Sequence, residues 1–221
     1  MAHSRAAFDL PSERFGFFEP TDEKGGERLD RIPVVAGEIR IGDRAYLQPD
    51  RIGGVLDAGA DIVVRAGWRN ARWLDADGKL ADMLAILHKG TERGLIDQPI
   101  FITRKSGAPL ALRLVAVKKS PQAAEIARCK ARKQATKAGY QISKGTLIAA
   151  EWVIIVTSLA PEAFTAEDVL ALYRLRWRVE LAFKRLKSLI GLKVRTAGAK
   201  CTTEPALNCL FEGGAKVYRS C

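Results

Sequence analysis

Residues 173–187 read YRLRWRVELAFKRLK, and four side chains recur in them at helical spacing: Tyr173, Arg176, Glu180 and Lys187. Steps of three, four and seven residues place these side chains within about 60° of one helix face. Apolar residues form an adjoining stripe: Leu172, Leu175, Val179, Ala182, Leu186 and Ile190. The segment therefore predicts a helix that packs on a sheet by one side. Its other side combines a phenol, cations and one carboxylate, a set suited to a metal ligand whose neighbours bind phosphate.

A second carboxylate, Asp43, stands just past a predicted strand. Residues 38–41 alternate polar and apolar side chains, which is typical of a half-buried strand. A helix over residues 49–58 and a strand over 61–65 then predict a βαβ crossover. Ligand-binding groups collect at the carboxyl ends of strands in open α/β sheets. Taken alone, Asp43 is more simply interpreted as a turn or capping residue, and it is the helix with Glu180 that favours a functional role.

These two segments resemble the signature of the DDE transposases of the insertion sequence four (IS-four) family. The Tyr-x2-Arg-x3-Glu-x6-Lys pattern of residues 173–187 is similar to the family's last motif, and Ile41-Gly42-Asp43-Arg44-Ala45-Tyr46 is similar to the segment around its second catalytic Asp. The resemblance implies an α/β fold, with a ribonuclease-H-like mixed sheet flanked by helices and a β-rich insertion before the last core helix. It also implies metal-dependent cleavage and transfer of DNA strands at insertion-sequence ends.

The resemblance assigns roles to individual residues. Asp43 and Glu180 are expected to be two of three catalytic carboxylates that bind Mg²⁺ (or Mn²⁺), with two ions in the intact enzyme. Tyr173 and Lys187 are expected to position phosphates, and Arg176 to contact the backbone at the transposon end. The implied partners are double-stranded DNA, as transposon ends and as target, and a second transposase chain in a homodimer. The implied location is the bacterial cytoplasm, in association with the nucleoid.

The family's first catalytic Asp has no evident counterpart in this sequence. In the family it lies on the first core strand, well upstream of the second Asp, and Asp9, Asp22 and Asp30 are poor replacements by position. We therefore expect an incomplete core and a truncated, defective copy that is inactive as an isolated chain. The alternative is a non-catalytic DNA-binding or interaction protein that keeps the transposase fold. Cleavage that depends on a divalent metal ion would distinguish the two.

The expected organisation is a first part of the core over residues 8–96, an insertion over 97–150, the last strand and helix over 151–193, and an irregular divergent tail over 194–221. The insertion opens with a predicted hairpin and continues as a basic helix over 121–139. Three of its cations are candidate DNA-backbone contacts, with an ordinary solvated helix as the equal alternative: Lys130, Arg132 and Lys133. The apolar run 152–157 predicts a central strand, and Thr165 with Asp168 predicts the capped start of the next helix.

Composition is consistent with one substantial core and a polyanionic partner. The chain has 221 residues, 48% of them hydrophobic, and a formal net charge of +11. Lys and Arg in such excess favour nucleic acid as the partner. No apolar run approaches the length of a membrane span. The four cysteines lack the spacing of a zinc site and are expected to be free thiols: Cys129, Cys201, Cys209 and Cys221.

Overall fold

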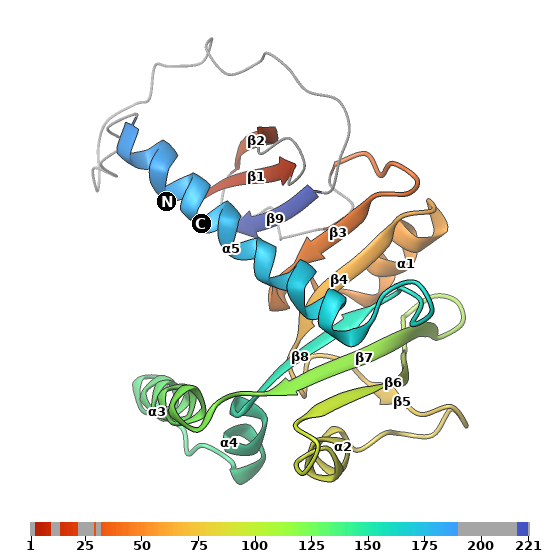
Figure 1. Cartoon of the computed structure of the whole chain (residues 1–221), viewed down its shortest axis with the longest axis vertical. Helices are drawn as coiled ribbons and strands as arrows, with labels where there is room; N and C mark the ends of the chain where they lie inside the picture. Colours follow the sequence, from red (N-terminus) through yellow and green to blue (C-terminus); the bar gives the residue numbers. More distant parts are fainter. Residues whose placement is uncertain (1–2, 10–13, 22–28, 30–31, 190–215, 221) are drawn as a thin grey trace.

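The structure is a computed structural model (Figure 1) and describes the backbone of residues 3–9, 14–21, 29, 32–189 and 216–220. Side chains are described for residues 29, 32–178, 181 and 185. Among the described residues, no helix combines the length and apolar character needed to cross a membrane. Cys129 is an exposed free thiol, as predicted, and the other three cysteines lie outside the described residues.

One mixed sheet of nine strands runs through the described residues (Figure 1). In chain order the strands are β1 (His3–Asp9), β2 (Arg14–Thr21), β3 (Ile39–Gly42), β4 (Asp61–Ala66), β5 (Trp73–Leu74), β6 (Leu95–Ile102), β7 (Leu110–Lys118), β8 (Trp152–Thr157) and β9 (Lys216–Ser220). Across the sheet the order is β2-β1-β9-β3-β4-β8-β7-β6-β5.

The strand directions determine where the carboxyl ends of the central strands lie. β3 is parallel to β4, β4 is antiparallel to β8, and β8 is antiparallel to β7. β3, β4 and β7 therefore run in the same direction, and their carboxyl ends lie at the same end of the sheet. Segments that follow these three strands are consequently brought together although they are far apart in the sequence.

Helices cover both faces of the sheet. They are η1 (Arg44–Tyr46), α1 (Pro49–Asp57), α2 (Met83–Lys89), α3 (Pro121–Lys137), α4 (Lys144–Ala150) and α5 (Ala166–Leu189). On β4, Ile62 and Val64 face a core that contains residues of α1 and α2, whereas Val63 faces a second core that contains residues of α5. This alternation is the period of two that a strand imposes on its side chains. The predicted α/β class, a mixed sheet flanked by helices, is confirmed and is consistent with a ribonuclease-H-like core.

Two local predictions are confirmed in detail. The apolar run 152–157 forms β8, which lies between β4 and β7 and is buried over most of its length. At the start of α5 the Thr165 hydroxyl accepts a hydrogen bond from the Asp168 backbone N–H (3.2 Å), while the Asp168 carboxylate accepts from the Thr165 backbone N–H (2.9 Å). This reciprocal pair satisfies two backbone donors that a helix start leaves free.

The predicted insertion shares the sheet of the core. β6 and β7 form the expected hairpin and extend the sheet beyond β8, and α3 and α4 then connect β7 to β8. The division into segments 8–96, 97–150 and 151–193 stays a prediction. Of the tail, residues 190–215 and 221 lie outside the described residues, and Lys216–Ser220 forms β9 beside β1 and β3. Asp9 ends β1, whereas Asp22 and Asp30 are not described.

Buried Arg113 ties α5 to the sheet. It stands on β7 with 7% of its surface exposed, and its guanidinium binds both carboxylate oxygens of Asp97 on β6 (2.7 and 2.6 Å). The same guanidinium donates to the carbonyl oxygens of Leu159 (3.4 Å) and Phe164 (2.7 Å), in the segment that leads into α5. Hydrogen bonding to Asp97 raises the pKa of Arg113 above its ordinary value. One side chain therefore fixes where the last helix begins.

We expect Arg113→Ala to lower the free energy of unfolding by about 2 to 3 kcal/mol, because it leaves a carboxylate and two carbonyl oxygens without their donor. Urea unfolding followed by circular dichroism measures this loss. The matched control is Arg132→Ala on α3, whose contact with Glu125 is long (3.5 Å) and exposed, so that a change below about 0.5 kcal/mol is expected. Equal losses in the two variants would contradict this role of Arg113.

Candidate functional site

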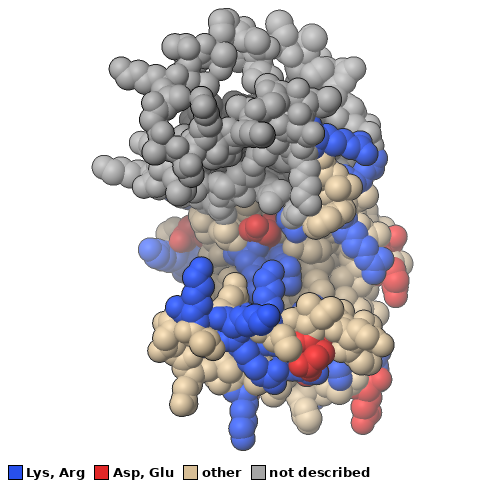
Figure 2. All heavy atoms as spheres, turned by 90° about the vertical axis from the view of Figure 1, so that its left-hand side faces the viewer, with Lys and Arg blue, Asp and Glu red and all other residues tan. Residues whose placement is uncertain are grey.

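A cleft of about 740 Å³ opens at the carboxyl ends of β3, β4 and β7. Six cationic side chains and a single carboxylate, that of Asp43, are among the described residues that line it. The cations are Arg44, Arg65, Arg69, Lys119, Lys130 and Arg176. Figure 2, which looks at the α3 side of the molecule, shows Lys and Arg side chains gathered in one patch. The cleft is therefore a strongly positive site within an α/β fold.

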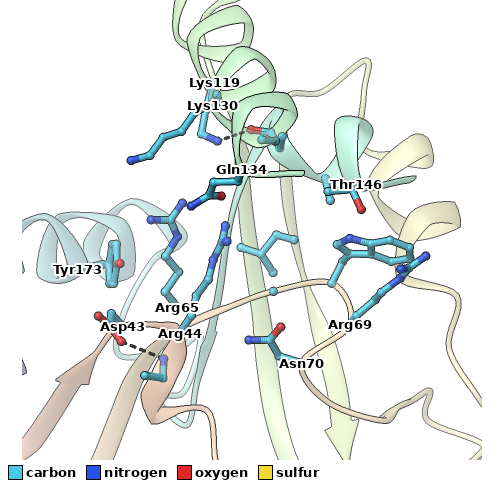
Figure 3. A pocket seen from close by; sticks show the side chains of 18 of the residues that line it. Asp43, Arg44, Arg65, Arg69, Asn70, Lys119, Lys130, Gln134, Thr146 and Tyr173 are labelled. Carbon is cyan, nitrogen blue, oxygen red and sulfur yellow. Dashed lines mark hydrogen bonds between the residues drawn. The ribbon is translucent and has the colours of Figure 1, made fainter. Parts of the chain in front are cut away.

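The walls of this cleft come from the ends of central strands and from the helices α3, α4 and α5. Arg44 follows β3, Arg65 is the last residue but one of β4, and Lys119 follows β7. Figure 3 shows Arg44 and Arg65 extending from the strand ends toward α3, with Tyr173 of α5 on one side and Gln134 of α3 nearby. The cleft thus exists because the sheet brings three strand ends together and α3, α4 and α5 flank them.

Asp43 lies at the cleft and also caps a helical turn. Its Oδ1 accepts a hydrogen bond from the Ala45 backbone N–H (2.9 Å) at the start of η1 (Figure 3). Its Oδ2 has no hydrogen-bond partner among the described residues. The capping role considered from the sequence is therefore real, and it leaves one carboxylate oxygen available to a ligand.

Two buried donors in the cleft have no partner among the described residues: Arg65 Nε and the Tyr173 hydroxyl. Buried polar atoms are almost always hydrogen-bonded, and an unpaired one costs about 1 to 3 kcal/mol. The guanidinium of Arg176 lies over the Tyr173 ring, with 5.7 Å between Cζ and the ring centroid, which helps to fix both side chains. The arrangement suits a ligand rich in hydrogen-bond acceptors.

The cations of the cleft repel one another, which contributes to the lowered pKa values of Lys119 and Arg44. Burial, then repulsion by Arg65 and Arg44, lowers the pKa of the Lys119 ammonium to about 8. Burial, then repulsion by Arg65, also lowers the pKa of Arg44. None of these three cations forms an ion pair with a carboxylate in the part of the chain that the structure describes. The site therefore holds uncompensated positive charge, as a site for a polyanion does.

The structure brings several predicted site residues together. Asp43, Tyr173, Arg176 and Lys130 all line the cleft. By contrast, Arg132 contacts Glu125 on its own helix, and Lys133 is exposed and not among the residues that line the cleft.

Glu180 and Lys187 lie on α5 about two and four turns beyond Tyr173, and their side chains lie outside what the structure describes. Their predicted approach to Asp43 and to phosphate stays a prediction. Among the described residues, no group of three or more His, Cys, Asp or Glu side chains is placed to hold a metal ion.

Sequence reasoning missed four of the six cations in the cleft: Arg44, Arg65, Arg69 and Lys119. A signal was present for Arg44, Arg65 and Lys119, because each stands at or just after the end of a strand that the sequence predicts. The signal becomes specific only when the strand order is known, since Lys119 is brought near Arg65 through the pairing of β4, β8 and β7.

Comparisons with known proteins show the family of this chain. A family model described as "Transposase DDE domain" matches residues 20–199. The chain is 39% identical, over 191 residues, to the protein named "Putative transposase InsL for insertion sequence element IS186A" and to the "Transposase for insertion sequence element IS421", both of Escherichia coli. Each match covers 84% of this chain and 51% of the relative, so the chain spans about half the length of the curated relatives it matches. No solved structure matches the chain.

The two roles of Asp43 are separable by substitution. We expect Asp43→Asn to change the free energy of unfolding by less than about 0.5 kcal/mol, because its side-chain oxygen still accepts from the Ala45 N–H. Asp43→Ala removes the cap and should cost about 1 kcal/mol. Thermal and urea unfolding of both variants measure these effects. A loss in Asp43→Asn as large as in Asp43→Ala would show that the negative charge itself stabilises the turn.

Proposed function

Because the chain belongs to the transposase DDE domain family, we propose that its cleft binds DNA and takes part in the cleavage and joining of DNA strands at insertion-sequence ends. The observation that supports this most directly is the crowding of six cations at the carboxyl ends of three strands, where Arg65 has a buried donor without a partner and Lys119 is repelled by its neighbours. Phosphate groups supply both the negative charge and the acceptor oxygens that such a site lacks.

In this proposal, different residues of the cleft contact different parts of the DNA backbone. Arg65 and the Tyr173 hydroxyl offer buried donors to phosphate oxygens, and Arg176 binds the backbone at the transposon end from the same helix. Lys130 reaches the cleft from α3. We place Lys187, further along α5, on the continuing phosphate backbone. These contacts are to backbone phosphates, so they position the DNA without selecting a base sequence.

Membership in this family implies the use of a divalent metal ion. We assign Asp43 and Glu180 as two ligands of Mg²⁺ or Mn²⁺, with two ions in the complete site, because carboxylate oxygens are the ligands that these ions prefer. When bound, such ions activate the attacking oxygen and stabilise the leaving one. The described residues fit this group only in part, since Asp43 is the one carboxylate among those that line the cleft.

The partners follow from the same proposal. Double-stranded DNA enters both as transposon end and as target, and a second transposase chain forms a homodimer around it. We place the protein in the bacterial cytoplasm, in association with the nucleoid. The alternative function is DNA binding without catalysis, which is supported by the use of one Asp43 oxygen as a helix cap.

DNA binding should be strongly dependent on salt. We expect the triple change of Lys130, Arg132 and Lys133 to Ala to flatten the log-log salt slope by about one unit for each phosphate that the protein no longer neutralises. Because only Lys130 of the three lines the cleft, Lys130→Ala alone should account for most of this change. Fluorescence anisotropy of a labelled duplex at several salt concentrations measures the slope. An unchanged slope in the triple variant would make α3 an ordinary solvated helix.

Cleavage, where present, should depend on Glu180. With matched end DNA and Mn²⁺, we expect Glu180→Gln and Asp43→Asn to abolish strand cleavage while binding in chelator persists, because only the metal ligands are removed. The matched control is Glu167→Gln, an exposed carboxylate on the first turn of the same helix. Gel analysis of end-labelled DNA reports the products. Metal-dependent cleavage that survives Glu180→Gln would remove Glu180 from the site, and binding with no cleavage under any condition would favour the alternative function.

A further inference from the structure

Lys119 occupies a fixed position inside the cleft. It follows β7, and its backbone N–H donates to the Glu151 carbonyl oxygen (2.8 Å) next to β8. Its ammonium donates to the carbonyl oxygen of Ala150 at the end of α4 (Figure 3). The side chain is half-buried. Lys119 is therefore held at the end of β7 by hydrogen bonds to the carboxyl end of α4, which is how a binding group is kept in place.

The charges that face Lys119 come from several elements. Arg65 of β4 and Arg44 of η1 repel its ammonium, and Lys130 of α3 lines the same cleft. The acid that acts on it is Glu151, but one Glu151 oxygen is already bound to Arg128 at 2.5 Å. Across the cleft, α5 contributes the Tyr173 hydroxyl and Arg176, and Asp43 lies beside Arg44. Lys119 thus carries a charge that the described residues do not neutralise.

A second observation shows what kind of group would complete the site. Arg65, one of the two cations that repel Lys119, has a buried Nε–H without a partner in the described part of the chain. A single phosphate has enough oxygens to accept from an ammonium and two guanidinium groups at once. It would also supply the negative charge that is missing between them. Water could satisfy the donor of Arg65 but carries no negative charge to neutralise the cations.

We propose that Lys119 is a DNA-contacting residue that binds one backbone phosphate inside the cleft together with Arg65 and Arg44. This inference rests on the proposed function, because it takes DNA as the source of the phosphate. It adds a contact from the residue that follows β7, a position to which neither the sequence motifs nor the comparisons assign a role. The contact is to the backbone and is therefore independent of base sequence.

The contact has a measurable signature in pH. Burial and the neighbouring Arg residues lower the pKa of Lys119 to about 8 in the free protein, so the ammonium loses its proton as the pH rises through this value. A bound phosphate favours the charged form and raises the pKa again. DNA binding should therefore take up a proton on Lys119 above pH 8. By linkage, the affinity should fall as the pH rises, by about tenfold between pH 7 and pH 9.

The test measures the affinity of the full chain for a short fluorescein-labelled duplex between pH 7 and pH 9, at constant ionic strength. We expect the unmodified chain to show the fall of about tenfold. Lys119→Gln should bind more weakly at pH 7 and show little further loss at pH 9. Lys119→Arg keeps its charge over this range, so its affinity at pH 9 should equal its own affinity at pH 7. Lys137→Gln, at the exposed end of α3, is the matched control and should keep the profile of the unmodified chain.

A calorimetric measurement tests the assignment of Lys119 independently of affinity. Titration in two buffers of different ionisation enthalpy should report uptake of about 0.7 proton per duplex site at pH 8.5. The value for Lys119→Arg should be near zero. Circular dichroism of each variant verifies folding, and Lys119→Arg keeps the test decisive if Lys119→Gln does not fold.

The possible outcomes distinguish the role of Lys119 from the proposed binding of DNA. A pH-independent affinity of the unmodified chain, or an unchanged profile in Lys119→Arg, overturns the role of Lys119 while DNA binding stands. No DNA binding by the folded, unmodified chain at pH 7 overturns the proposed function and this inference with it. A parallel titration with inorganic phosphate separates the two sources of phosphate. Binding of inorganic phosphate that depends on Lys119, without binding of DNA, would also overturn the proposal.

Discussion

The parallel direction of β3, β4 and β7 is the constraint on which the site depends. A parallel pair and two antiparallel pairings place the carboxyl ends of these strands at one end of the sheet. Ligand-binding groups of open α/β sheets gather at such ends. Asp43, Arg65 and Lys119 are neighbours for this reason alone, since long stretches of sequence separate them. The two apolar cores on either face keep the pairing fixed.

In the free protein, the cleft holds cations that repel one another, on a sheet that two apolar cores stabilise. Lys119, Arg65 and Arg44 have no carboxylate partner among the described residues, and their repulsion reduces the stability of the folded state, as does the buried Arg65 Nε–H without a partner there. Burial of the branched side chains of β4 and β8 offsets this cost. Arg113 shows the contrasting case, because its buried charge is fully paired and serves the fold. Among the described residues, the paired cation Arg113 thus serves the fold, whereas the cations without a carboxylate partner line the cleft proposed to bind DNA.

Much of the fold follows from local sequence patterns, and much of the site does not. The strand 152–157, the capped start of α5 and the helix after Asp43 were predictable because hydrophobic period and capping chemistry are local. Tyr173, Arg176 and Asp43 were predictable through their motifs. Lys119 was not, because its place depends on which strands pair. Asp43 shows that a functional candidate can also have the ordinary role that its position suggests. Its carboxylate caps a helical turn by accepting a hydrogen bond from the Ala45 backbone N–H.

The placement of α3 and α4 has an evolutionary consequence. This pair of helices leaves the sheet at Lys118 and returns at Trp152, two residues that are direct partners across β7 and β8. The points of departure and return therefore stay adjacent whatever lies between them. Relatives can lengthen, shorten or replace the connecting segment without changing the register of the core, because the sheet does not depend on its length. The wall of the cleft formed by α3 and α4 is therefore less constrained in length than the paired strands opposite it.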